Sequence, residues 1–132
     1  MKVSVETARK EVKDLIELKK MRPNKAARMQ GVVEQLVEAV TLGDVVFDLP
    51  NGKITQKLAF PLGENKTVTE LVYDIRIPVR RLNEAYVRLG GVDGQAKINA
   101  CIEVLTNIFA TQVLDLEPTD KELADYIAVF FT

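Results

Sequence analysis

The stretch “TVTELVYDIRIPVRRLNEA”, residues 67–85, begins with the pattern of a strand and ends with the pattern of a helix. In its first half, apolar side chains alternate with more polar ones, with Leu71, Tyr73, Ile75 and Ile77 in step. This period of two residues is typical of a strand that is buried on one face. Pro78 has no amide hydrogen for sheet pairing, and its φ angle suits the first turn of a helix. We therefore expect the chain to pass from sheet to helix at Pro78.

Two further extended runs, residues 44–49 and 53–60, precede this junction. Apolar residues recur at every second position in both, apart from Gln56, and these are Val45, Phe47, Leu49, Ile54, Leu58 and Phe60. Between the runs, Asn51-Gly52 favours a tight hairpin turn, because such turns need positive φ angles. Short connections of this kind predict a three-stranded antiparallel meander, half buried against helices.

Helical patterns lie on both sides of these strands, over residues 4–20, 23–42, 78–89, 94–114 and 117–131. Ser4 is a suitable N-cap, and Gly43 a suitable C-terminal cap of the second helix. Because Gly31 weakens a helix, the alternative is that the second helix begins only at Gly31 and leaves residues 22–30 looser. Gly90-Gly91 ends the third helix, and Asp93 is a suitable cap for the fourth. Thr119 and Glu122 have the spacing of a capping box for the last.

The fourth helical pattern is the most regular, and it predicts a central core helix over residues 94–114. Its apolar stripe consists of Ile98, Cys101, Ile102, Leu105, Ile108, Phe109 and Val113. The last helix should face inward through Leu123, Ile127, Phe130 and Phe131.

The order of helices, strands and helices predicts an α+β fold rather than an alternating α/β fold. We expect N-terminal helices, the three-stranded meander and three C-terminal helices packed on it. At 132 residues the chain has the length of one domain. Within it, residues 1–44 form a basic N-terminal helical segment and residues 45–132 an α+β core.

The net charge of −1 conceals an asymmetry along the chain. Residues 1–30 carry nine Lys or Arg against four Asp or Glu, whereas residues 31–132 carry nine against fifteen. A solvated, Lys-rich helix is one interpretation of the basic block. A partner for one block is another, and so is head-to-tail contact between copies in a homo-oligomer.

The residues for common catalytic chemistry are missing from the sequence. It contains no His, and its one cysteine, Cys101, lies among apolar residues. No zinc site can be built from the usual ligands, and “GGVDG” (90–94) does not match a P-loop. Asp120, Glu122 and Asp125 lie near a helix start, where acidic residues favour the helix dipole, so we interpret them as capping residues. We therefore expect no enzyme, metal or cofactor.

Compartment and membrane association can also be predicted. No apolar run approaches the roughly 20 residues of a membrane span. The first residues lack the apolar stretch of a secretory signal. A single cysteine suits a reducing compartment. We expect a soluble intracellular protein that does not bind membranes.

Seven basic residues occupy two expected helices separated by a short break: Lys10, Lys13, Lys19, Lys20, Arg22, Lys25 and Arg28. Such a pair could form a helix-turn-helix, and its charge could bind phosphates. The second helix, however, lacks polar base-reading residues at its start, and the rest of the chain is acidic. Nucleic acid is thus an unfavoured partner, and a small DNA-binding regulator is an alternative function.

Three arginines surround the junction at Pro78, namely Arg76, Arg80 and Arg81. Arg80 and Arg81 fall in the first helical turn, where positive charge opposes the helix dipole. Either an intramolecular partner, such as Asp74 or the acidic C-terminal helix, or an acidic client would explain them. The candidate partner-binding residues are Arg76, Arg80, Arg81, Lys19, Lys20, Arg22, Phe130 and Phe131.

From about residue 45 onward the chain resembles the tail assembly chaperones of long-tailed bacteriophages, in particular the small chaperones of P2-like and Mu-like phages. The similar elements are “KITQKLAFPL”, “GENKTVTELVYDIRIPVRRL”, “INACIEVLTNIFA” and “LEPTDKELADYIAVFF”, in this order. Together with their connections they cover about two-thirds of the chain. Residues 1–44 have no counterpart in the family pattern.

The resemblance implies a non-enzymatic protein of the host cell cytoplasm. Proteins of this family bind the phage tape measure protein, keep its long helices soluble and recruit tail tube subunits during tail morphogenesis. A different phage structural or adaptor protein with an α+β core is a further alternative.

Overall fold

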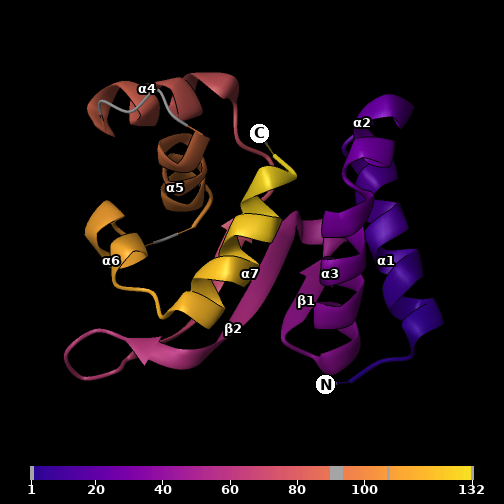
Figure 1. Cartoon of the computed structure of the whole chain (residues 1–132), viewed down its shortest axis with the longest axis horizontal. Helices are drawn as coiled ribbons and strands as arrows, with labels where there is room; N and C mark the ends of the chain where they lie inside the picture. Colours follow the sequence, from indigo (N-terminus) through magenta and orange to yellow (C-terminus); the bar gives the residue numbers. More distant parts are fainter. Residues whose placement is uncertain (1, 90–93, 107, 132) are drawn as a thin grey trace.

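The computed structural model describes residues 2–89, 94–106 and 108–131. Along the chain lie α1 (Val5–Leu18), α2 (Pro23–Arg28), α3 (Gln30–Leu42), β1 (Val45–Asp48), the 3₁₀ turn η1 (Leu49–Asn51), β2 (Lys53–Leu62), β3 (Val68–Asp74), α4 (Val79–Leu89), α5 (Gly94–Leu105), α6 (Ala110–Leu114) and α7 (Pro118–Val129). Figure 1 shows the helices gathered around one small sheet. The expected α+β fold, with helices before and after the strands, is confirmed.

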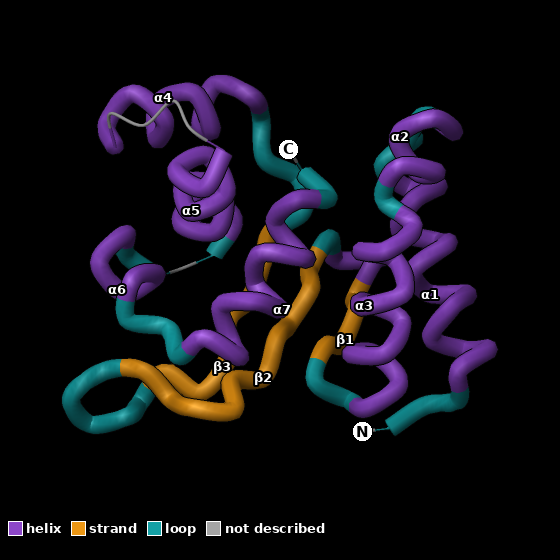
Figure 2. The backbone as a smooth tube through the Cα atoms, viewed as in Figure 1, coloured by secondary structure: helices purple, strands orange, loops and turns teal. Residues whose placement is uncertain are grey.

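The sheet is an antiparallel meander of order β1-β2-β3 (Figure 2). Gln56 at its centre pairs with Val45 on one side and Leu71 on the other. Helices α3, α7 and α5 contact β1, β2 and β3 respectively, and α1 packs on α3. One face of the sheet is therefore covered by helices, as the alternating strands predicted.

The helix ends of the N-terminal segment follow local sequence signals. The Ser4 hydroxyl accepts a hydrogen bond from the Thr7 backbone N–H at 3.1 Å, which confirms it as the N-cap of α1. Gly43 ends α3 in the left-handed conformation, with φ 82°. The apolar face of α1 joins the same hydrophobic core as the sheet and the C-terminal helices through Ala8, Val12 and Leu15.

The hairpin between β1 and β2 is longer than the expected tight turn. Residues 49–52 form its loop, and Asp48 pairs with Lys53. Of the Asn51-Gly52 pair, Gly52 alone has a positive φ, at 66°. Asn51 instead donates a side-chain hydrogen bond to Asp48 at 2.8 Å, so a 3₁₀ turn replaces the predicted geometry.

The predicted helix over residues 94–114 is wrong in one respect, because it breaks into α5 and α6. Phe109 becomes the N-cap of α6, where its N–H donates to the Gln112 side chain at 2.9 Å, and its ring is 74% exposed. Ile108 and Val113 remain buried on either side of it. The break turns the chain so that these two residues reach the core. The predicted turn at residues 90–91 and the cap at residue 93 lie outside the described residues.

The start of α7 also differs from the prediction. Its N-cap is Glu117, whose carboxylate accepts from the Thr119 N–H at 2.8 Å, so the capping box at Thr119 is wrong. Asp120 is not a solvated cap, since only 3% of it is exposed. Its carboxylate accepts from the backbone N–H groups of Ala59 and Phe60, each at 2.9 Å. Asp120 therefore ties α7 to the irregular part of β2, between Lys57 and Leu62.

The same contact explains two misjudged residues of β2. Gln56, expected to spoil an apolar face, is fully buried between partners: it accepts from the Tyr73 hydroxyl at 2.7 Å and donates to the Asp120 carbonyl at 3.0 Å. Phe60, expected inside, is 53% exposed. The pairing of β2 with β3 shifts register between Lys57 and Leu62, and this irregularity turns Phe60 outward.

Candidate functional site

A cleft lies where the basic N-terminal segment meets the end of α7 and the connection from β3 to α4. Its volume is about 460 Å³. Five of the thirteen residues that line it are basic, namely Lys19, Lys20, Arg22, Lys25 and Arg28. Its apolar wall consists of Ile75, Ile77, Leu82, Leu105, Phe130 and Phe131. We call it the basic cleft, because no described residue along its walls is acidic.

The turn between α1 and α2 places three of the basic residues, Lys19, Lys20 and Arg22, around one space. Lys19 is the C-cap of α1, and Lys20 adopts a left-handed conformation with φ 52°. The Lys20 N–H donates to Glu17 O at 3.0 Å and the Met21 N–H to Ile16 O at 3.1 Å. This is the Schellman pattern, in which glycine usually occupies the left-handed position. A lysine there brings a charge to the cleft at some cost in backbone strain.

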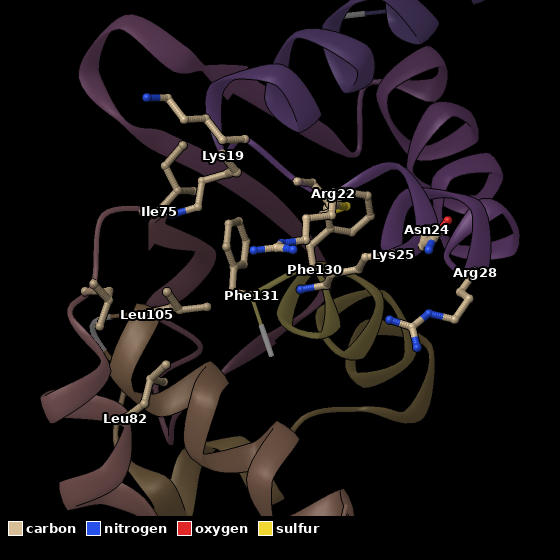
Figure 3. Close-up of a pocket in the computed structure, with 13 residues that line it drawn as sticks. Lys19, Arg22, Asn24, Lys25, Arg28, Ile75, Leu82, Leu105, Phe130 and Phe131 are labelled. Carbon is tan, nitrogen blue, oxygen red and sulfur yellow. Dashed lines mark hydrogen bonds between the residues drawn. The ribbon is translucent and has the colours of Figure 1, made fainter.

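Helix α2 then carries the second group of cations. Arg22 is its extended N-cap, and Pro23 begins the helix. Lys25 and Arg28 lie in its last turn, where positive charge is favoured by the helix dipole. Figure 3 shows the nitrogen-bearing ends of Arg22 and Lys25 close together beside Phe131, with the end of Arg28 farther to one side.

Lys19 closes one end of the cleft. Its ammonium donates to the Ile75 carbonyl at 2.6 Å and lies 5.4 Å from the centre of the Phe131 ring. Phe130 beside it is 2% exposed and belongs to the core. Lys19 thus joins the end of α1 to the end of β3 and to the last residues of α7. It holds together the apolar residues at this end of the cleft, which we call its floor.

The other cations of the cleft are not neutralised by side chains in the described parts of the chain. No ion pair or side-chain hydrogen bond within residues 2–89, 94–106 and 108–131 involves Lys20, Arg22, Lys25 or Arg28. Four cations elsewhere on the surface have an ion-pair partner, namely Arg9, Lys10, Lys53 and Lys121; Arg9, for example, pairs with Glu34 at 2.6 Å. Like charges gathered at one place repel one another, so an anionic ligand would be attracted to the cleft.

Of the predicted partner-binding residues, five line the basic cleft: Lys19, Lys20, Arg22, Phe130 and Phe131. The three arginines near Pro78 do not. Arg76 lies against Gly52, where a Cβ would approach its Nε to 3.3 Å, and Arg80 lines a separate hollow on α4 with Asn83, Glu84 and Val87. The structure therefore separates the predicted set into two groups.

Asp74 accounts for part of the charge at the junction. The Arg76 N–H donates to Asp74 Oδ1 at 3.0 Å, and Lys53 lies 3.4 Å from the other oxygen. The Arg76 hydrogen bond lowers the pKa of the Asp74 carboxyl, and the charges of Lys53 and Arg81 act in the same direction. This favours the intramolecular explanation for Arg81.

Sequence reasoning missed several residues of the cleft. Lys25 and Arg28 belong to the predicted basic block but not to the predicted partner-binding residues. Their spacing from Arg22, three residues at each step, is the signal that could have identified them, because such positions share one side of a helix. The contributions of Ile75, Leu82 and Leu105 depend on packing between distant elements and leave no local signal.

Cys101 lies behind the floor of the cleft, on α5. Its thiol is buried and donates to Ala128 O at 3.5 Å. Burial raises the pKa of this thiol from 9.0 to about 12, which keeps it protonated and unreactive near neutral pH. It is a core residue, as its apolar surroundings predicted. Within the described residues, no group of three or more His, Cys, Asp or Glu could hold a metal ion.

Comparison with known protein families, with curated proteins and with solved structures found no match for this chain. No helix in the described part of the chain is long and apolar enough to cross a membrane.

Proposed function

We propose that the protein is a non-enzymatic tail assembly chaperone of a long-tailed bacteriophage, which binds the tape measure protein through the basic cleft. The observation that carries this proposal is the basic cleft itself, in which five cations surround an apolar floor. Such a surface suits a protein segment that is acidic on one side and apolar on another. The family resemblance of residues 45–132 supplies the kind of client.

In this proposal the two segments of the chain have different tasks. The core supplies the apolar floor through the ends of β3 and α7 and through α5, while residues 19–28 supply the charge. Residues 1–44, which have no counterpart in the family pattern, thus contribute to client binding. Recruitment of tail tube subunits would use another surface. The complex would form in the cytoplasm of the host cell.

Co-expression with the tape measure protein tests the proposal. We expect the client to become soluble and to co-purify with this chain. The variant with Arg22, Lys25 and Arg28 all changed to Glu should lose the client while keeping its helical circular dichroism. A control with Lys2, Lys13 and Lys97 changed to Glu carries the same charge change outside the cleft and should retain it. If the client stays insoluble with the unmodified chain, the chaperone function is wrong.

The same cations favour a second candidate function, a small DNA-binding regulator. Phosphate contacts are strongly salt-dependent, so a gel shift at low salt that disappears at high salt would support it. The position of the cations weighs against this function, because they surround an apolar cleft. No shift at low salt would remove this candidate. Another phage structural or adaptor protein remains the alternative if both tests fail.

A further inference from the structure

We propose that the segment bound in the basic cleft is an acidic amphipathic helix, with its carboxylates on Arg22, Lys25 and Arg28 and its apolar side chains over the floor beside Phe131. This inference rests on the proposed function, since it names the chemistry of the client segment. Four observations support it: the spacing of the cations, the apolar floor, the state of the two aromatic rings and the position of Lys19.

The cations are spaced like the repeat of a helix. Arg22, the extended N-cap of α2, is followed at three-residue steps by Lys25 and Arg28, and the step from Lys25 to Arg28 advances about 4.5 Å along the helix axis. Carboxylates three or four residues apart on a partner helix recur at a similar distance, about 5–6 Å. One small anion would engage only part of this row. A helix with repeated carboxylates can engage all of it.

The floor requires an apolar ligand surface as well as charge. Ile77, Leu82 and Phe131 are each partly buried, and they remain in contact with the space of the cleft. Covering them with apolar side chains removes their surface from water and also strengthens the neighbouring ion pairs. A ligand with charge on all sides would lose hydration at this floor without compensation. An amphipathic helix meets both requirements.

The two aromatic rings argue against a nucleic acid as the occupant. Proteins that bind single strands stack bases on open aromatic faces. Phe130 is 2% exposed, so its ring is not open. The Lys19 ammonium already lies over the Phe131 ring, 5.4 Å from its centre. Phe130 therefore cannot stack on a base because it is buried, and Lys19 occupies one face of the Phe131 ring.

Lys19 has a different role from the other cations. Its ammonium is already engaged by Ile75 O at 2.6 Å, so it holds the floor rather than the ligand. We expect it to be a positioning residue. Lys19→Met should weaken helix binding several-fold without changing how steeply the affinity falls with salt. Loss of a ligand-binding cation, in contrast, should reduce that slope.

The test uses the full chain and a fluorescein-labelled acidic amphipathic peptide of about 18 residues, long enough to form a helix. Fluorescence anisotropy at about 0.05 M salt measures its binding. Changing Arg22, Lys25 and Arg28 together to Gln should weaken binding about 10-fold or more. This variant neutralises charge without reversing it, which protects the fold of α2. The control, with Lys2, Lys13 and Lys97 changed to Gln, should stay within about twofold of the unmodified chain.

A matched peptide with Gln in place of every Glu should not bind. Inorganic phosphate and a single-stranded DNA of similar length serve as competitors, and neither should displace the acidic peptide at equal concentration. Equal binding by the neutralised variant, or no binding by the unmodified chain, would overturn the inference. Displacement by DNA at lower concentration would assign the cleft to nucleic acid instead.

The two proposals fail separately. If the acidic peptide binds through Arg22, Lys25 and Arg28 but the tape measure protein does not co-purify, the cleft binds acidic helices and the tail function is wrong. If the tape measure protein co-purifies equally with the neutralised variant, the chaperone function stands and the assignment of the cleft is wrong.

Discussion

The two ends of helix α7 carry surfaces of opposite charge. At its C-terminal end lies the basic cleft, and at its N-terminal end lies a smaller groove of about 230 Å³ against α3. Three acidic residues line this acidic groove, Glu38, Asp44 and Glu122, with no basic residue among its described walls. Figure 1 shows α3 and α7 running in opposite directions, so the two surfaces lie at opposite ends of this helix pair.

The helix dipole explains part of this difference. Acidic residues are favoured near the N-terminus of a helix and basic residues near its C-terminus, and the partial charge at each end is about half an elementary charge. The cations Lys25 and Arg28, in the last turn of α2, follow this rule, and so does Glu122 near the start of α7. Glu38 and Asp44 do not, because they lie near the C-terminal end of α3. The helix dipole therefore does not account for the whole charge of either surface.

Of the two surfaces, the basic cleft should lose more stability on mutation, because its floor contains a buried ring. Phe130→Ala removes a buried ring and should lower the free energy of unfolding by about 3 kcal/mol or more, because a cavity remains in the core. Phe109→Ala removes a ring that is 74% exposed and should cost less than about 0.5 kcal/mol. Urea denaturation measures both. Similar losses in the two variants would mean that Phe130 is not part of the core.

At the acidic end, Asp120→Ala should cost about 2 kcal/mol. The change leaves the N–H groups of Ala59 and Phe60 without their acceptor at a partly buried position. Glu122→Ala in the same turn is the control and should cost less than about 0.5 kcal/mol, since its side chain is exposed. Thermal unfolding compares the two. Equal effects would show that Asp120 is an ordinary capping residue.

Alkaline pH should destabilise the packing behind the basic cleft. Burial raises the pKa of Cys101 to about 12, so the folded state keeps its proton while the unfolded chain loses it above about pH 9. Stability from this group is complete below pH 9 and falls as the pH rises, by roughly 1 kcal/mol per unit. Burial also raises the pKa of Tyr73, which acts in the same sense. Urea midpoints between about pH 8 and 11 should fall less steeply in Cys101→Ala. An unchanged slope would contradict the burial of the thiol.

Lys20→Gly tests whether the positive charge of Lys20 at the basic cleft comes at a cost in stability, because lysine is strained in the left-handed conformation. Glycine suits the left-handed conformation at this position, so the variant should be up to about 1 kcal/mol more stable. It should also bind the acidic peptide less tightly, because a cation is lost. Lys13→Gly, within α1, is the contrasting control and should be less stable by about 1 kcal/mol. A destabilised Lys20→Gly would show that the side chain itself supports the turn.

Head-to-tail contact between copies, the smallest expected effect, would join the acidic groove of one molecule to the basic cleft of the next. Sedimentation should then show weak self-association at about 0.02 M salt that disappears at about 0.5 M. Glu38→Lys with Glu122→Lys should abolish it. Mixing that variant with the Arg22, Lys25 and Arg28 to Glu variant should restore it, because the charges are again opposite. A monomer at high concentration and low salt would rule out this contact.

Local features of the fold follow from the amino-acid sequence alone. The α+β order, the caps at Ser4 and Gly43 and the strand period around Tyr73 depend on interactions within a few residues, so they could be predicted. The same holds for five of the thirteen residues that line the basic cleft. Lys19, Lys20 and Arg22 adjoin the signal of a helix break, and Phe130 and Phe131 belong to one amphipathic pattern.

Tertiary structure decided the rest. The burial of Asp120 depends on its contact with β2, some sixty residues earlier in the chain. The break before α6 depends on the position of the core. Ile108 and Val113 are both buried in the core, whereas Phe109 between them is exposed. The basic cleft exists because the ends of α1, β3 and α7 meet. Lys19, at the end of α1, contacts both Ile75 and Phe131. Such long-range contacts compete with local helix and strand preferences, and they produce no periodic pattern in the sequence. The cleft could therefore not be predicted from the sequence, and neither could its separation from Arg76 and Arg80.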